Sequence, residues 1–437
     1  MGLKNSEHIS KIIVHPNNSN VVWVASQGPL WSSGGERGLY KTVDGGKNWY
    51  KTLGNSEWTG VTDIMIDPRN PDLIYAATWD RHRTVAAYMG GGPGSGIHKS
   101  EDGGETWKKL TKGIPKSNLG KIGIAISYQK PDVIYAAIEE DRTKGGVYKS
   151  TDRGESWKKM SNTVSGGTGP HYYQELYTSP HEFDRLYLMN VHILTSKDGG
   201  KNFEQLTNER NFYYYFDKKH SDHHAMAFKP SDPDYLMVGT DAGIYESFDD
   251  AKNWHYFLNL PLTQFYKVAV NNKEPFYHIF GGTQDNGTWE SLKLNENNPW
   301  SQVSGGDGAY ASVINFAKAY ILSSQKGYTM IKDWNNPFNW NYGGGDKYSN
   351  YSWAYLFPPD FDRENDALFI SPVYSNPSND HILYYAGGNN LYRNNDVYLI
   401  LRFRCFSSAL RSLNACGWRV LFASFLELCC QFGVFMS

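Results

Sequence analysis

Aspartates at turns rich in glycine, asparagine or histidine are the residues of this 437-residue sequence that could carry out chemistry. Asp222 precedes two histidines, Asp285 lies in a Gln-Asp-Asn-Gly run, and Asp307 lies in a Gly-Gly-Asp-Gly run. Hydrolysis of a glycosidic bond needs two carboxyl groups, one of which acts as the general acid. These three aspartates are therefore candidate catalytic residues. Aspartates in such loops also cap turns and bond to the neighbouring backbone, so this structural interpretation stays open.

Polar and aromatic side chains near these turns, or in comparable loops, are candidate ligand-binding residues. Sugar rings and peptides stack on aromatic side chains, and polar groups fix the orientation of a ligand. The candidates are His223, His224, Gln284, Asn286, Asp241, Trp79, Arg81 and Tyr172. Adjacent histidines on a strand point to opposite faces, so we predict no metal site at His223 and His224. We also predict no cofactor, because the sequence contains no phosphate-binding loop and no zinc-binding helix motif.

A recurring motif predicts the elements that position these residues. It reads Ser/Thr-x-Asp-x-Gly-x-x-Trp and occurs in five copies; the fourth has Phe for Trp and the fifth has lost its Gly. The Asp can accept hydrogen bonds from backbone N–H groups just beyond it, and Gly takes a positive φ at little cost, so each copy predicts a hairpin turn. We interpret the Asp and aromatic residues of the copies as structural: Asp44 and Trp49, Asp102 and Trp107, Asp152 and Trp157, Asp198 and Phe203, and Asp249 and Trp254.

Short apolar strands recur with the same interval as the motif. One unit reads as strand, turn, strand, loop, strand, motif turn, strand, and four antiparallel strands repeated every roughly 50 residues are typical of a β-propeller. The predicted units span residues 8–55, 60–112, 120–162, 172–208, 222–260, 264–303 and 308–345, and an eighth begins at residue 367. We therefore predict an all-β propeller of about seven to eight four-stranded blades over residues 1–396, truncated at both ends and with an incomplete last blade.

The motif resembles the Asp-box, or bacterial neuraminidase (BNR), repeat, and the series of units is similar to sortilin N-terminal-like and xyloglucanase-like propellers. A narrower resemblance, to bacterial BNR-repeat "glycosyl hydrolase" proteins, covers about residues 1–396. It rests on the runs Gly91–Ile97, Ser221–Ala225, Leu260–Tyr266, Gly281–Gly287 and Gly305–Gly308. The resemblance implies a propeller that either binds a ligand on its loops, as sortilin-like propellers do, or hydrolyses a polysaccharide, as xyloglucanase-like ones do.

The propeller topology assigns the candidate residues to one face. The loop before each first strand and the loop between the second and third strands emerge on the same side of a blade, opposite the Asp-box turns. Asp222 and Asp307 precede first strands, and Asp241 and Asp285 follow second strands. We therefore expect all four aspartates near the centre of one face. The same face should carry a set of aromatic and cationic residues: Trp31, Arg37, Trp58, Trp79, Arg81, His82, Arg83, Tyr88, Tyr172 and Tyr173.

Two functions remain open at this point. The first is the binding of a polysaccharide or an extended peptide on the loop face. The second is glycoside hydrolysis by paired aspartates. The name of the family that the sequence resembles favours hydrolysis, and the absence of a clear catalytic pair favours binding. No Arg-Ile-Pro signature of a sialidase is present.

Composition bounds the partners and the compartment. The formal net charge of -2 gives no electrostatic attraction to nucleic acid or to an anionic membrane, so we predict neither as a partner. The four cysteines all lie beyond residue 404, so no disulfide is expected within the repeats. We expect a secreted or periplasmic protein whose signal peptide precedes this sequence.

Residues 397–437 differ from the repeats in composition. At Asp396 the sequence enters another Asp box and then changes to Leu, Phe, Cys, Arg and Ser. A membrane anchor would need about 20 apolar residues, and arginines interrupt this run, so we expect no membrane span. An amphipathic cap is a second interpretation. Translation out of frame or of a truncated gene is the third, and we favour it because it explains both the break within a motif and the change in composition.

Overall fold

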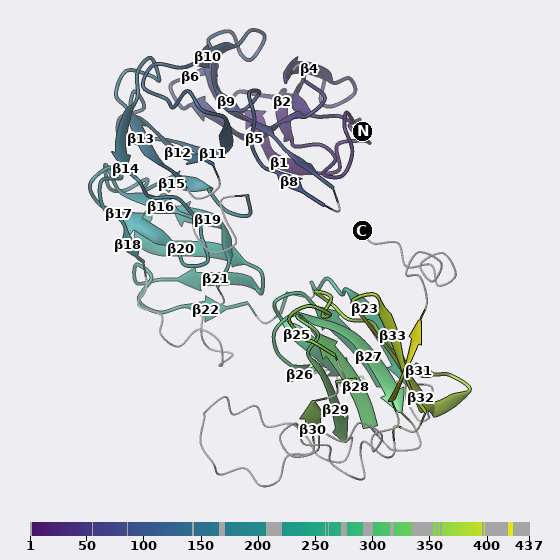
Figure 1. Ribbon diagram of the computed structural model, residues 1–437. Helices are drawn as coiled ribbons and strands as arrows, with labels where there is room; N and C mark the ends of the chain where they lie inside the picture. The colour runs from purple at the N-terminus through teal and green to yellow at the C-terminus, as the bar shows by residue number, and fades with distance from the viewer. Residues whose placement is uncertain are drawn as a thin grey trace. The chain divides into compact units, whose positions relative to one another are not determined.

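The structure, a computed structural model, describes most of the chain. The described residues are 2–54, 56–84, 86–141, 144–165, 171–206, 221–257, 259–260, 262–271, 278–291, 300–314, 319–333, 353–355, 357–358, 361–395, 397 and 418–422. They belong to two compact units, Met1–Asn259 (unit 1) and Leu260–Ser437 (unit 2). Both units are built from β-strands, and each is described separately (Figure 1).

Unit 1 contains five four-stranded antiparallel sheets whose strands follow one another in chain order. The first sheet is β1 (Ile9–His15), β2 (Asn18–Ser26), β3 (Gly38–Thr42) and β4 (Tyr50–Leu53). The second is β5 (Thr59–Asp67), β6 (Asn70–Asp80), β9 (Gly96–Ser100) and β10 (Lys108–Leu110). A small hairpin of β7 (His82–Arg83) and β8 (Tyr88–Met89) is inserted between β6 and β9.

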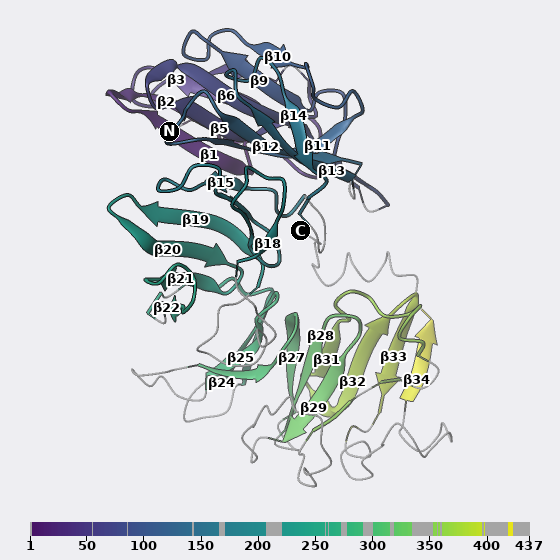
Figure 2. The same ribbon diagram turned by 90° about the vertical axis from the view of Figure 1, so that its left-hand side faces the viewer.

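The remaining three sheets of unit 1 repeat this order. The third is β11 (Leu119–Ile126), β12 (Ile134–Glu140), β13 (Lys144–Ser150) and β14 (Lys158–Ser161). The fourth is β15 (Leu176–Thr178), β16 (Leu186–Leu188), β17 (Leu194–Ser196) and β18 (Glu204–Gln205). The fifth is β19 (His223–Lys229), β20 (Asp232–Thr240), β21 (Gly243–Ser247) and β22 (His255–Tyr256) (Figure 2).

Unit 2 contains three sheets of the same kind. The sixth is β23 (Lys267–Asn271), β24 (His278–Thr283), β25 (Gly287–Ser291) and β26 (Ser301–Ser304). The seventh is β27 (Gly308–Ile314), β28 (Ala319–Ser324), β29 (Thr329–Asp333) and β30 (Trp353–Tyr355). The eighth is β31 (Val373–Asn376), β32 (Asn379–Gly387), β33 (Asn390–Asn394) and β34 (Trp418–Phe422).

These sheets are the blades of a β-propeller, which confirms the predicted fold. First strands of consecutive sheets contact one another, as inner strands of propeller blades do: β1 with β5, β5 with β11 and β11 with β15 in unit 1, and β23 with β27 and β27 with β31 in unit 2. Two features differ from the sequence-based expectation. The chain divides into two units at residues 259 and 260. The eighth sheet, expected to be unfinished, has a fourth strand because β34 pairs with β33.

The hydrophobic cores lie between consecutive sheets. The central residues of the second strands β6 and β12 are covered on both faces and are therefore apolar; Ile74 and Tyr75 of β6 and Ile134 and Tyr135 of β12 are all 0% exposed. The largest cluster joins the second and third sheets, where Trp157 packs among aliphatic side chains of both. Each such large side chain, when fully buried, contributes roughly 1.5–3 kcal/mol.

The Asp-box turns close the outer hairpin of each blade of unit 1. In the second sheet, Asp102 Oδ1 accepts hydrogen bonds from the backbone N–H groups of Glu105 (3.1 Å) and Thr106 (2.9 Å). Gly103 and Gly104 follow it with φ of 70° and 88°. A Cβ on Gly104 would lie 2.9 Å from Nε1 of Trp23, which belongs to the first sheet. In this box, glycine thus suits both the left-handed backbone conformation and the close approach of the preceding blade.

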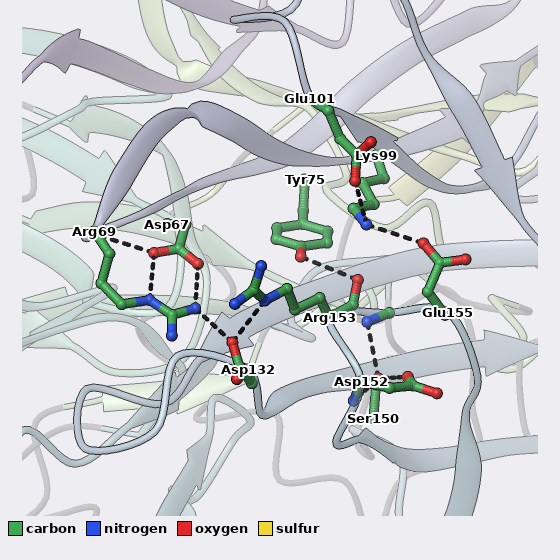
Figure 3. A network of polar contacts seen from close by, with 11 residues as sticks. Asp67, Arg69, Tyr75, Lys99, Glu101, Asp132, Ser150, Asp152, Arg153 and Glu155 are labelled. Atoms are coloured by element: carbon green, nitrogen blue, oxygen red, sulfur yellow. Dashed lines mark hydrogen bonds and ion pairs between the residues drawn. The ribbon is translucent and has the colours of Figure 1, made fainter.

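Boxes after the first also contact the preceding blade through polar groups. Figure 3 shows the box of the third sheet, where Tyr75 Oη of the second sheet donates to the Arg153 carbonyl at 3.1 Å. Asp132 lies between Arg69 (2.6 Å) and Arg153 (2.7 Å), so one carboxylate joins the two sheets. The motif therefore forms the turn of its own blade and a contact surface for its neighbour.

Candidate functional site

Five loops of unit 1 meet at the end of the sheets opposite the Asp-box turns. They are residues 27–37, 81–95, 171–175, 221–222 and 241–242, and we call the surface that they form the loop face of unit 1. Backbone hydrogen bonds hold neighbouring loops together: Arg83 N donates to Leu30 O at 2.9 Å, and Asp241 N donates to Asp222 O at 3.3 Å. An isolated bridge between Gly92 and Leu119 ties the second loop to the third sheet.

Arg37 organises the first of these loops from beneath. Its side chain is 1% exposed, and its guanidinium donates to the carbonyls of Gln27 (2.7 Å), Ser32 (2.8 Å), Arg81 and Pro29. Gly28 has a φ of 72°, and a Cβ there would lie 2.1 Å from Arg37 Cγ. Gly28 and the buried Arg37 therefore fix the conformation of the loop together. The hydrogen bonds of the Arg37 guanidinium go to the loop backbone.

The Gly91–Ile97 run has a structural role in the second loop. It passes over the carboxylate of Asp80, which is 7% exposed. That carboxylate accepts hydrogen bonds from Gly94 N at 2.7 Å and from Thr59 Oγ1 at 2.5 Å. A Cβ on Gly92 or on Gly94 would lie within 2.5 Å of an Asp80 oxygen, so the glycines permit the close approach.

Rings and cations form a continuous series across the loop face, which we call the aromatic series. Its members, in spatial order, are Trp31, Arg83, Tyr88, His171, Tyr172, Tyr173 and His224. Arg83 Cζ lies 5.5 Å from the Trp31 ring and 6.0 Å from the Tyr88 ring. The His171 ring lies 4.9 Å from Tyr88 and 4.3 Å from Tyr172. Trp31 is 53% exposed and Tyr172 is 47% exposed, so both present ring surface to solvent.

The series ends at a histidine paired with a carboxylate. Tyr173 stacks on His224 with the ring centroids 5.5 Å apart and 12° between the planes. His224 Nε2 lies 2.7 Å from Asp241 Oδ1. Burial lowers the pKa of His224, but the hydrogen bond to Asp241 and the charges of Asp241 and Glu175 outweigh it, so the net pKa is raised from 6.5. The pairing with Asp241 therefore favours the protonated form of the histidine.

Asp222 lies next to this pair. Its carboxylate accepts hydrogen bonds from Tyr173 Oη and, at 2.9 Å, from Ser221 Oγ. Its φ of 64° is in the left-handed region, which is uncommon outside glycine and is enriched at functional sites. The structure thus brings Asp222, His224 and Asp241 together at one part of the loop face.

Charged residues at one register of the first strands were missed by the sequence analysis. Each directly precedes the apolar run of a first strand: Lys11, Asp63, Lys121, Glu175 and His224. Lys11 pairs with Asp63 at 2.7 Å, and Lys121 pairs with Glu175 at 2.5 Å. The signal was present in the sequence as a titratable residue at the same position of consecutive repeats. These residues form a row of alternating charges along the inner strands, and the row ends at the His224–Asp241 pair.

Two of the residues predicted to bind a ligand have buried side chains. Trp79 is 2% exposed and donates its Nε1–H to Gly90 O at 2.8 Å. His223 is 0% exposed, and its Nδ1 lies 2.9 Å from Val191 O. Trp79 lies beneath Arg81, whose Cζ is 5.3 Å from the Trp79 ring. Both residues support the loop face and do not form its surface.

The remaining predicted residues belong to unit 2, where they form a separate cluster. Asp307 is 8% exposed, and its Oδ1 accepts a hydrogen bond from Asp285 N at 3.0 Å. Gln284 Oε1 accepts a hydrogen bond from Tyr266 Oη, and Asn286 Nδ2 donates to Gln284 O at 3.2 Å. Asp307 therefore caps a backbone turn, the structural interpretation left open by the sequence. The four aspartates form two pairs, Asp222 with Asp241 and Asp285 with Asp307, one in each unit.

The described part of the chain has neither a metal-binding cluster nor a membrane-spanning helix. There, no three His, Cys, Asp or Glu side chains gather closely enough to hold a metal ion. The described residues also contain no helix of the length and apolarity needed to cross a membrane.

Comparisons with known proteins show the fold. No protein-family model and no curated protein matches the sequence. A GH74 enzyme from Niastella koreensis has a similar structure, with a TM-score of 0.52 and 15% identity over 88% of this chain and 55% of that chain. A GH74 xyloglucanase from Xanthomonas campestris gives a TM-score of 0.47 and 13% identity over 88% of this chain and 62% of that one. The structure of YCF48 bound to D1 peptide gives a TM-score of 0.32 and 12% identity, over 75% of this chain and 90% of that chain. The chain thus has a β-propeller fold and spans 55–62% of the length of the GH74 structures.

Proposed function

We propose that the chain binds a polysaccharide on the loop face of unit 1. The observation that carries this proposal is the aromatic series. Rings stack with the faces of sugars, and a linear saccharide contacts several rings in succession along its length. Arg81, Arg83 and His224 supply donors beside the rings, and Asp222 and Asp241 supply acceptors.

The direct test is an affinity measurement with the full chain and a panel of soluble polysaccharides that includes xyloglucan. Tyr172→Ala removes an exposed ring without opening a core, so we expect binding of the best ligand to weaken about tenfold. Tyr128→Ala is the matched control, because Tyr128 is 61% exposed but lies in the β11–β12 turn, at the Asp-box end of the sheet. The proposal fails if no polysaccharide binds, or if both substitutions have the same effect. Preferential binding of an extended peptide would also contradict it.

Glycoside hydrolysis is a second candidate function, favoured by the environment of Asp222. A carboxylate with a left-handed backbone, bonded to Tyr173 and adjacent to the Asp241–His224 pair, could act in a two-carboxylate mechanism. Release of new reducing ends from a bound polysaccharide tests it. Asp222→Asn should then abolish turnover and preserve affinity, with Asp307→Asn as a comparison in the other unit. Binding without turnover by the unsubstituted chain would reject this candidate and leave the binding proposal intact.

A further inference from the structure

Three arginines gather in the first two loops of the loop face, and their partners differ. Arg37 is buried and donates hydrogen bonds to four backbone carbonyls. Arg81 is partly buried; it donates to the neutral side chain of Gln27 and lies over the Trp79 ring. Arg83 is exposed and lies beside the rings of Trp31 and Tyr88.

Arg81 and Arg83 contrast with the other cations of the blades. Lys41, Lys99 and Lys149, which occupy third strands, each pair with a carboxylate of the box or sheet that follows. Within the described residues, neither Arg81 nor Arg83 forms an ion pair with a carboxylate, and their contacts are rings and a neutral amide. Burial lowers the pKa of Arg81. Burial and the charge of Arg81 also lower the pKa of Arg37, although Glu7 and Asp80 oppose this. The second loop therefore carries two guanidinium groups that no carboxylate of the described residues pairs with.

The chemistry of the Arg81 and Arg83 guanidinium groups indicates which kind of ligand group would bind them. A guanidinium stacked on a ring keeps its N–H groups at the edge, where a planar oxyanion can accept two of them. The same rings offer faces for sugars on either side of the anion. Trp31 and Tyr88 flank Arg83, and Tyr172 follows them in the aromatic series.

We infer that the ligand of the loop face is an acidic polysaccharide, whose carboxylate or sulfate groups bind Arg83 and Arg81 while its sugar rings stack on Trp31, Tyr88 and Tyr172. This inference rests on the proposed function and narrows it, because a neutral polysaccharide would leave both guanidinium groups without an anionic partner.

The test compares each acidic polysaccharide with its own neutral form, using the full chain. Polygalacturonate is paired with its carboxyl-reduced derivative, and κ-carrageenan with its desulfated derivative, so the two pairs distinguish carboxylate from sulfate recognition. At least one acidic form should bind about tenfold more tightly than its neutral form, since hydrogen bonds between charged groups are the strong ones. Raising the salt concentration should reduce that difference, because Arg83 is exposed.

Variants locate the recognition. Arg83→Gln should remove most of the preference for the acidic form and change affinity for the neutral form by less than about twofold. Lys47→Gln is the matched control, since it removes an exposed cation from the Asp-box turn between β3 and β4. Equal binding of acidic and neutral forms would overturn the inference and leave the proposed function standing. Failure to bind any polysaccharide would overturn both. Tighter binding of polyglutamate than of every polysaccharide would also overturn the inference, by pointing to an acidic peptide.

Discussion

His224 shows how a single contact sets the charge of a residue at the site. Its pKa is raised despite burial because Asp241 bonds to its imidazole. The folded-state pKa lies above the unfolded value of 6.5, so the pair stabilises unit 1 fully below that value and loses this contribution as the pH rises through the folded-state pKa. An NMR titration should find the His224 pKa above 6.5. In Asp241→Asn it should fall below 6.5, since burial then dominates; an unchanged pKa would contradict the assignment.

The second glycine of the Asp box sets a residue-scale test of the fold. Gly200 has a φ of 89°, and a Cβ there would lie 2.7 Å from Val147 Cγ1. Gly200→Ala should therefore cost at least about 1–2 kcal/mol for the left-handed backbone, in addition to the clash. The fifth Asp box, which has lost its Gly, has Ala251 at the same position, with a φ of 67° and 2% exposure. Ala251→Gly relieves the strain of the left-handed backbone but removes a buried methyl group, which costs about 0.8 kcal/mol. Its net effect on the free energy of unfolding should therefore be small. Urea denaturation of the two variants checks this difference, and equal effects would contradict it.

At the scale of the element, the Asp-box turns make the stability of unit 1 depend on pH. Hydrogen bonds from the backbone and side chain of Asn48 and from Thr42 lower the pKa of Asp44 to about 2. Asn202 lowers that of Asp198 to about 2, against the opposing effect of burial. Because these folded-state values lie below the ordinary 3.8, the turns stabilise unit 1 above that pH and lose this stabilisation as the pH falls toward 2.

The urea concentration at the unfolding midpoint of unit 1 should therefore decrease as the pH is lowered from 5 to 2. Asp198→Asn should make the midpoint depend less on pH. Asp234→Asn is the control, because it removes an exposed carboxylate of the fifth sheet outside any box. A pH dependence that Asp234→Asn flattens as much as Asp198→Asn does would indicate a general charge effect and contradict the role of the box.

Sequence patterns predicted the elements better than the site. The box and the alternating strands gave the sheets and their order, because both are local features with fixed spacing. The side-chain environment of Trp79 could not be predicted, since its burial depends on the inserted β7–β8 hairpin and on the loop at Gly90. The two aspartate pairs were assigned to one face by topology, but the role of Asp307 depends on a single contact to Asp285 N that the sequence does not encode locally. The fourth strand of the eighth sheet was missed because its sequence, after residue 396, no longer follows the repeat.

At the scale of the whole molecule, the division into two units predicts separable stabilities. Phe280 is 0% exposed and packs between the sixth and seventh sheets, so Phe280→Ala should destabilise unit 2 by about 3–5 kcal/mol. Ile124 is 0% exposed between the second and third sheets, and Ile124→Ala should destabilise unit 1 by about 2–5 kcal/mol. Calorimetry should assign each loss to a different transition. Polysaccharide affinity measured well below both transitions should be unaffected by Phe280→Ala. One shared transition, moved by both substitutions, would contradict the division.

The central claim is that ligand binding is located on the loop face of unit 1. Hydrogen–deuterium exchange of the full chain, measured with and without a bound polysaccharide, tests it most directly. The account predicts slower exchange in residues 27–37, 81–95 and 171–175 when the ligand is present, and no change in the Asp-box turns or in the turn at Asp285. Protection confined to the loops of unit 2, or to the Asp-box end of the blades, would contradict the account.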